Sequence, residues 1–197
     1  MCDVIKVLDD AIYNNEVVDN IDLSNLNLTF KDFTALICDR LEANKTNFRA
    51  SIFEHASFKD CCFTETNFSE GCLENVEIID SRFYKSNFEF ANLRNSRIVI
   101  SFGNDLCFDD ADLSNSKLDH ISIVDSSLKK SNLANIEVID SNFKNSDLTG
   151  SDLSNGKFKN VNFSGAKLIN LKLEGAKFEN CNFDDAILDI NTRNFII

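Results

Sequence analysis

Apolar residues return at every fifth position over most of this chain. From Phe48 to Leu188 the central residue of each five-residue unit is Phe, Leu, Ile or Val, and only Gly103 departs from this rule. The residue two places before the centre is usually small, and the residue just before the centre is often Asn or Asp. No insertion breaks the register over 29 consecutive units.

This spacing limits the backbone to a coiled, extended path. In an extended segment the centre and the residue two places before it point to the same face. A helix is excluded because a period of five matches neither 3.6 nor 3.5, and a plain strand would not restart its inward face every five residues. The chain must therefore turn once per unit and stack its inward side chains into columns. These features predict an all-β solenoid with a filled interior.

Several units also carry a recognisable motif. Residues 91–95 (ANLRN), 111–115 (ADLSN) and 146–150 (SDLTG) resemble the A(D/N)LxX motif of the pentapeptide-repeat proteins. The resemblance implies a right-handed quadrilateral β-helix with four units per coil, and hence about seven coils for the 29 units. Repeat scaffolds carry unrelated activities, so the function must be sought on the surface.

The first 44 residues differ from the rest and are predicted to form a partly helical N-terminal cap, residues 1–44. Apolar residues at helical spacing predict a helix over 4–14, and the five-step register predicts a degenerate coil over 17–28. A second helix is predicted over 30–42, although Phe33 and Cys38 keep the five-step register and leave a further coil as the competing interpretation. An open solenoid end needs a cover, so we expect this segment to cap it; binding to a receptor is the other interpretation.

The remainder divides into a β-helix over residues 45–190 and a C-terminal tail over residues 191–197. Pro is absent and Gly numbers only 6, so no linker is indicated. No run of 18 apolar residues and no basic leader is present, which predicts a cytoplasmic protein without membrane contact. Secretion as an effector is the alternative location.

No group of residues indicates catalysis, a metal or a cofactor, so we expect a protein that is not an enzyme. The seven cysteines lack metal-site spacing and indicate reduced structural thiols. His55 and His120 both occupy the last position of a unit, and neither has a second ligand or nucleophile at a matching offset in the sequence.

Acidic residues dominate the middle of the chain. The net charge is −12, and residues 54–128 carry 14 Asp and Glu against 6 Lys and Arg, whereas residues 129–191 carry 9 against 8. The candidate functional carboxylates stand at corner positions: Asp80, Asp105, Asp110, Asp125 and Asp140. Such a surface repels nucleic acid, which predicts no direct nucleic-acid binding, and it attracts a basic groove. A purely solubilising role is the alternative.

The resemblance to the pentapeptide-repeat family suggests a function for this acidic surface. Gyrase-protecting members of the family, which confer quinolone resistance on bacteria, are acidic rods held to mimic DNA in a topoisomerase. By that resemblance the partner is DNA gyrase or topoisomerase IV. The chain differs from those members because loops do not interrupt its register and its tail after Leu188 is short.

A group of apolar residues at outward positions surrounds Gly103, and we call it the apolar patch. Its members are Ile79, Tyr84, Val99, Ile100, Phe102, Val124 and Ile139. Gly103 indicates a local failure of the core column, and Leu106 is bulky where a small residue is expected. Exposed apolar patches usually mark contacts. Three covers are open: a terminal segment of the chain, a second copy in a homodimer, or another protein bound by a bacterial effector or scaffold.

Overall fold

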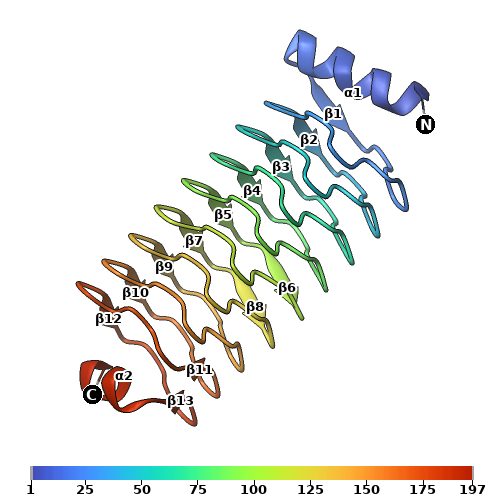
Figure 1. Ribbon diagram of the computed structural model, residues 1–197. Coiled ribbons are helices and arrows are strands. Elements are labelled where there is room, and N and C mark those ends of the chain that lie inside the picture. The colour runs from blue at the N-terminus through green and yellow to red at the C-terminus, as the bar shows by residue number, and fades with distance from the viewer. Residues whose placement is uncertain (1, 197) are drawn as a thin grey trace.

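Each coil of the chain takes twenty residues, because neighbouring strands pair residues twenty positions apart. Val18 pairs with Cys38, and Phe58 pairs with Ile78, always in parallel. The computed structural model, which describes residues 2–196, stacks these coils into a β-solenoid of about nine turns (Figure 1). The solenoid prediction is confirmed, and the predicted seven coils were too few because coils begin at Val17.

One side of the solenoid is a parallel sheet with one strand from each coil. In spatial order its nine strands are β1 (Val17–Asp19), β2 (Ile37–Asp39), β3 (Ser57–Lys59), β4 (Glu77–Ile79), β5 (Arg97–Val99), β7 (Lys117–Asp119), β9 (Glu137–Ile139), β10 (Lys157–Lys159) and β12 (Lys177–Glu179). Two shorter sheets lie on other sides. They pair β6 (Phe102–Asn104) with β8 (Ser122–Val124), and β11 (Lys167–Leu168) with β13 (Ile187–Leu188).

The corner of each unit is a residue in the left-handed region of backbone conformation. Nearly every fifth residue from Asn15 to Asp185 has a positive φ, for example 58° at Asn75 and 57° at Asn95. Asn, Asp and Gly tolerate this conformation best. Their abundance at corners therefore follows directly from the turn that each unit makes.

The Asn or Asp before each centre holds the following turn. The Asn47 Oδ1 atom accepts a hydrogen bond from the backbone N–H of Arg49 at 3.1 Å. The Asp152 Oδ1 atom does the same for Ser154 at 3.0 Å. These short side-chain-to-backbone bonds are typical of Asx turns, and they explain why polar residues precede so many centres.

The interior is filled by the two inward columns that the spacing predicts. Phe48, Phe68, Phe88 and Phe108 form one continuous stack, with ring centroids 4.8–5.3 Å apart from coil to coil. In the small column, buried hydroxyls donate to backbone carbonyls, as Ser116 Oγ does to Leu93 O at 2.8 Å. Aromatic packing and satisfied polar groups therefore coexist in one core.

The predicted helix over 30–42 is wrong. These residues form part of a coil, with bridges from Asp32 to Ile52 and from Glu42 to Cys62 and with β2 between them. Leu36 and Leu41 are bulky at positions where later coils have small residues, yet both are buried. The centres that follow them are the small Cys38 and Ala43, so large and small side chains have exchanged places and the layer stays filled.

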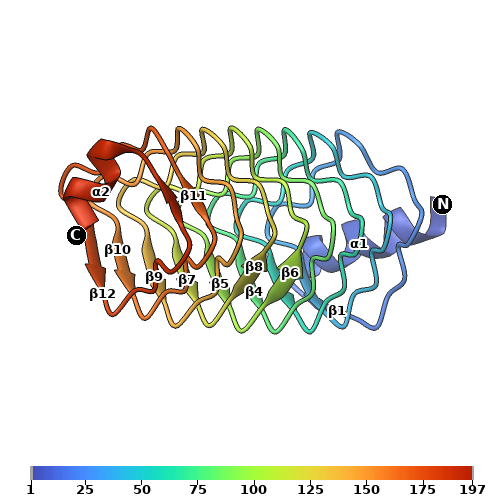
Figure 2. The ribbon, with the colours of Figure 1, turned by 90° about the horizontal axis from the view of Figure 1, so that it is seen from below.

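Helices close both ends of the rod. Helix α1 (Cys2–Asn14) lies at one end and packs the buried Leu8 and Ala11 on the first coil, while α2 (Ile190–Ile196) lies at the other (Figures 1 and 2). Residues 17–28 form a coil, and of the predicted tail only Ile197 falls outside the described residues. Neither α1 nor α2 has the length and apolar character that crossing a membrane requires.

Candidate functional site

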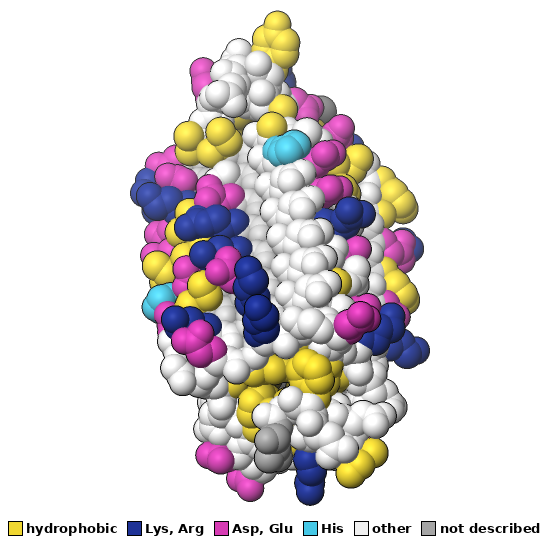
Figure 3. Space-filling view, turned by 90° about the vertical axis from the view of Figure 1, so that its left-hand side faces the viewer, with side chains coloured by type: hydrophobic (Ala, Val, Ile, Leu, Met, Phe, Trp, Pro, Cys, Tyr) yellow, Lys and Arg dark blue, Asp and Glu magenta, His cyan; other side chains and the backbone are white. Residues whose placement is uncertain are grey.

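The candidate carboxylates point outward from three corners of the rod. Asp80 and Asp140 lie in one corner column, Asp105 and Asp125 in the next, and Asp110 in a third. All five side chains are exposed, and all five residues are left-handed. Figure 3 shows one side of the rod, on which charged side chains of both signs border an uncharged stripe. The acidic surface thus wraps the rod rather than forming a single line.

These carboxylates differ in their neighbours. Asp125 accepts a hydrogen bond from Asn145 Nδ2 at 2.9 Å, and Asp140 accepts one from Asn160 Nδ2 at 2.7 Å. Within residues 2–196, the side chains of Asp80, Asp105 and Asp110 have neither a hydrogen bond nor an ion pair. A cationic partner can therefore pair with these three carboxylates without displacing another group.

The apolar patch divides into two parts. Tyr84 and Phe102 are 39% and 44% exposed, and with the half-buried Val124 they line a surface groove of about 230 Å³ that also contains Gly103, Asn104 and Ser122. We call this the β6–β8 groove. The other part lies on the adjacent large sheet.

On the large sheet the patch is less exposed than predicted. Ile79 and Ile139 are half-buried, and Asp119 lies between Val99 and Ile139 in the ladder. Val99 is only 8% exposed, so its prediction as an exposed residue is wrong. Its side chain lies between the ladder neighbours Ile79 and Asp119, one on each side.

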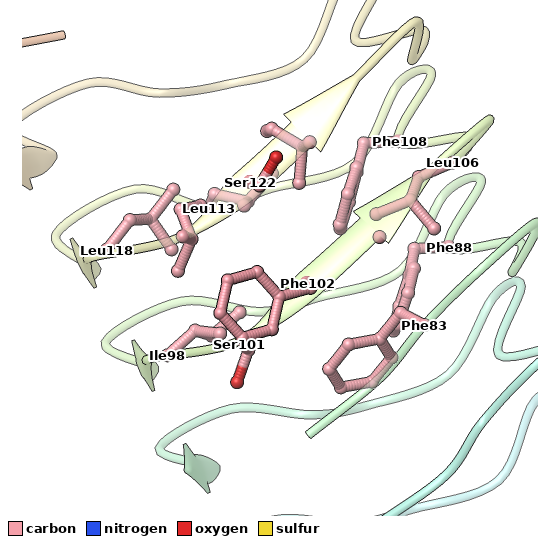
Figure 4. A pocket seen from close by; sticks show the side chains of 13 residues that line it. Phe83, Phe88, Ile98, Ser101, Phe102, Leu106, Phe108, Leu113, Leu118 and Ser122 are labelled. Carbon is pink, nitrogen blue, oxygen red and sulfur yellow. The ribbon is translucent and has the colours of Figure 1, made fainter. Parts of the chain in front are cut away.

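Below the groove, the missing side chain of Gly103 is replaced by Leu106. A Cβ atom placed on Gly103 would lie 2.9 Å from Leu106 Cδ1, which is too close. Figure 4 shows Leu106 beside Phe88 and Phe108 in the lining of a residual cavity of about 30 Å³. Gly103 is therefore a compensated exchange of volume rather than the local failure of the core that we predicted.

Ile100 links the two parts of the patch at the corner between β5 and β6. Its φ is 50° and its side chain is 48% exposed. Among the described residues it is the one β-branched residue with a positive φ. A β-branched residue in this region is a true conformational outlier. The sequence already indicated that Ile100 is unusual, because the five-step register places this isoleucine at a corner where other coils have Asn, Asp, His or Arg.

Neither terminal segment covers the groove. Figures 1 and 2 show α1 and α2 at opposite ends of the rod, and β6 and β8 in the middle coils. Helix α1 contacts β1, and α2 contacts β13. Cover by these helices, one of the three interpretations of the patch, is thereby excluded.

One cluster of potential ligands escaped sequence reasoning. Asp119, His120 and Asp140 place one ligand atom each within 4.8 Å of one another. Asp119 Oδ1 lies 2.6 Å from His120 Nδ1, and Asp140 Oδ2 lies 3.8 Å from His120 Nε2. The carboxylates of Asp119 and Asp140 thus lie beside opposite ring nitrogens of His120. The twenty-residue spacing from His120 to Asp140 was the available signal.

Two cysteines, Cys38 and Cys61, are buried in the core. Burial raises the pKa of the Cys61 thiol to about 12, and burial also raises the pKa of Cys38. Both thiols are neutral at physiological pH and inert as nucleophiles. Six cysteines are free thiols, and the seventh, Cys2, has a side chain outside the described ones.

A search of solved structures found matches that span most of this chain. HetL, a pentapeptide-repeat protein involved in heterocyst differentiation regulation from the cyanobacterium Nostoc, is 16% identical; the match covers 95% of this chain and 96% of HetL, with a TM-score of 0.39. Full-length QnrB1, a plasmid-mediated fluoroquinolone resistance protein, is 13% identical over 89% of this chain and 97% of QnrB1, with a TM-score of 0.45. No curated protein sequence matches.

The family model for pentapeptide repeats matches in overlapping segments over residues 42–70, 61–98, 107–145, 126–165 and 146–185. These segments cover more than half of the chain and leave out residues 99–106, where Ile100, Gly103 and Leu106 lie. The match to the family model thus stops before Val99 and resumes at Cys107, although the five-residue register continues through this stretch. The chain belongs to the family of pentapeptide-repeat proteins.

Proposed function

We propose that this chain is a non-enzymatic protein-binding module that mimics DNA and modulates or protects a bacterial type II topoisomerase, either DNA gyrase or topoisomerase IV. The observation that carries the proposal is the excess of exposed carboxylates in residues 54–128, some without a partner among the described residues. A basic DNA-binding groove attracts such a surface over a distance, and nucleic acid is repelled by it. The proposal includes a cytoplasmic location.

The placement of the charges supports mimicry. Three of the four corner columns carry candidate carboxylates, so the negative surface surrounds the rod as phosphates surround a duplex. About nine turns at roughly 4.8 Å give a rod of about 43 Å, the length of about 13 base pairs at roughly 3.4 Å each. One copy would fill part of a DNA-binding groove, and its binding would weaken as salt is added.

The test is a supercoiling assay across a titration of the protein. The variant changes Asp80, Asp105, Asp125 and Asp140 to Asn, which preserves the left-handed corners. A control variant removes the same number of charges from the last coils by Glu174→Gln, Glu179→Gln, Asp184→Asn and Asp185→Asn. We expect the parent and the control to inhibit or protect gyrase at micromolar concentration, and the first variant to lose this effect. An inactive parent, or a first variant as active as the parent, would refute mimicry.

A second candidate function is that of a scaffold or effector that binds another protein through the apolar patch. The observation that favours it is the β6–β8 groove, which neither terminal helix covers. Replacing Phe102 by Ser would then abolish partner binding. A homodimer formed through the same patch would appear as a doubled mass in light scattering, and Phe102→Ser would return it to the monomer.

A further inference from the structure

Ile100 has an unfavourable backbone conformation and an exposed apolar side chain at the same time. Its φ of 50° crowds the branched Cβ against the backbone, and 48% of the residue is exposed to solvent. Asn stands at the same corner in three other coils, as Asn20, Asn160 and Asn180. The fold therefore accepts Asn at this corner, and folding does not explain an isoleucine there. Strained residues of this kind are concentrated at functional sites.

The β6–β8 groove begins two residues after Ile100. Phe102 and Tyr84 form its apolar wall with Val124, and Gly103 contributes no side chain to its floor. Asn104 and Ser122 add polar groups that can bond to a peptide backbone. Ile100 and the groove thus form one surface that combines an exposed aliphatic side chain, two aromatic rings and a few polar atoms.

The borders of this surface are mainly acidic. Asp80 and Asp140 lie on the corner column of Ile100, and Asp105 and Asp125 lie on the column at the opposite edge. Three cations lie nearby, fewer than the four carboxylates: Arg82 and Lys85 toward the N-terminal end, and Lys144 on the coil after Val124 toward the C-terminal end. Cys62, Asp60 and Glu42 of the preceding coils raise the pKa of Arg82 and so favour its charged form. The field over the groove therefore favours a cationic ligand.

We propose that Ile100 and the β6–β8 groove form a docking site for a segment of a partner protein that presents an apolar side chain flanked by Lys or Arg. The apolar side chain packs against Ile100 and Phe102, and the flanking cations pair with the carboxylates at the borders. A second copy of this chain is a poor occupant because its own groove has the same acidic borders. The inference rests on the proposed function as a protein-binding module and specifies the partner surface.

The test uses three fluorescein-labelled peptides and the full-length protein. The first peptide, GKRGFGRKG, has an aromatic residue between basic pairs; the second, GKRGSGRKG, lacks the ring; and the third, GGSGFGSGG, lacks the charges. Fluorescence anisotropy measures their affinity for the parent, for Ile100→Asn and for Phe90→Asn. Phe90 is a matched control, because it is also an exposed apolar corner residue with a positive φ, on the diagonally opposite corner.

We expect GKRGFGRKG to bind the parent and the Phe90→Asn variant equally, and to bind Ile100→Asn about tenfold more weakly. The two control peptides should each bind the parent about tenfold more weakly than GKRGFGRKG does. The proposal is overturned if no peptide binds, if Ile100→Asn binds as the parent does, or if GKRGSGRKG equals GKRGFGRKG. A parent dimer that Ile100→Asn dissociates would also overturn it, in favour of a second copy.

The supercoiling assay separates this inference from the proposed function. Binding of GKRGFGRKG through Ile100 without any effect on gyrase would refute topoisomerase mimicry and leave the docking site intact. Equal inhibition of gyrase by the parent and by Ile100→Asn, with equal peptide binding, would refute the docking site and leave mimicry intact.

Discussion

The side of the solenoid around Leu93 and the side around Gly103 show two uses of the same repeat. Around Leu93 a small Ala91 and a large Leu93 fill the core, and Asn92 accepts a hydrogen bond from the backbone N–H of Arg94 at 3.1 Å. Around Gly103 the centre has no side chain, and Phe102 occupies the place of the polar acceptor. The second side thus gives up a core residue and a turn bond and gains an exposed aromatic ring.

The comparison teaches that the solenoid conserves the volume of its core more strictly than the position of each large residue. Leu106 fills the space at Gly103, just as Leu36 and Leu41 compensate for the small Cys38 and Ala43 in an earlier coil. Departures in the core are repaired internally. Departures at outward positions, such as Phe102 and Ile100, have no such repair.

The largest effect is expected from a charge in a regular part of the core. Phe143 is 1% exposed and its ring packs at a tilt against that of Phe163, so Phe143→Asp should abolish folding, since an unpaired buried charge costs several kcal/mol. Lys144→Ala, one position away and facing solvent, should change the free energy of unfolding by less than about 0.5 kcal/mol. Circular dichroism melting compares the two. A Phe143→Asp variant that melts like the parent would contradict the inward assignment.

A smaller effect is expected where the repeat is irregular. Leu106→Ala should lower the free energy of unfolding by about 2–5 kcal/mol, because it empties the space that Leu106 fills beside Gly103. The double variant Gly103→Leu with Leu106→Ala restores the ordinary pattern and should recover much of this loss. Urea denaturation of the single and double variants gives the energetic coupling between positions 103 and 106. Additive losses would show that Gly103 and Leu106 do not exchange volume.

A collective effect is expected at low pH in the regular coils. Burial raises the pKa of Asp152, but hydrogen bonds from Ser154 and the nearby Lys172 outweigh burial and hold the pKa below the ordinary 3.8. The pKa of Asp147 is lowered in the same way, because hydrogen bonds from Thr149 and the charge of Lys129 outweigh its burial. Because these pKa values are lower in the folded state than in the unfolded state, the two carboxylates contribute to the free energy of unfolding. This contribution is complete above about pH 4 and is lost as the pH falls through the folded-state pKa values. Melting temperature against pH measures the loss.

The variant Asp152→Asn sharpens that measurement. Its amide oxygen can still accept the hydrogen bond from Ser154, but it does not titrate. The melting temperature of this variant should therefore fall less steeply below pH 4 than that of the parent. An identical slope would mean that Asp152 does not contribute to the acid sensitivity.

Much of the fold could be predicted from the sequence, and less of the candidate site. The five-step register of inward residues predicted the solenoid because that spacing determines which side chains share a face. The helix over 30–42 was mispredicted because Leu36 and Leu41 resemble a helical face until the small Cys38 and Ala43 are considered with them. The exposure of Val99 depends on neighbours twenty residues away, which a local pattern does not reveal. The left-handed conformation of Ile100 followed from the register once corners were known to be left-handed.

The most direct test concerns the claim that the irregular coil gives up stability for an exposed binding surface. Urea denaturation should show that Ile100→Asn raises the free energy of unfolding by about 1–2 kcal/mol, because Asn relieves the left-handed strain of a β-branched residue. Because Phe90 is not β-branched, Phe90→Asn should raise the free energy of unfolding by less. A lower free energy of unfolding for Ile100→Asn would show that Ile100 stabilises the fold, and it would contradict the claim.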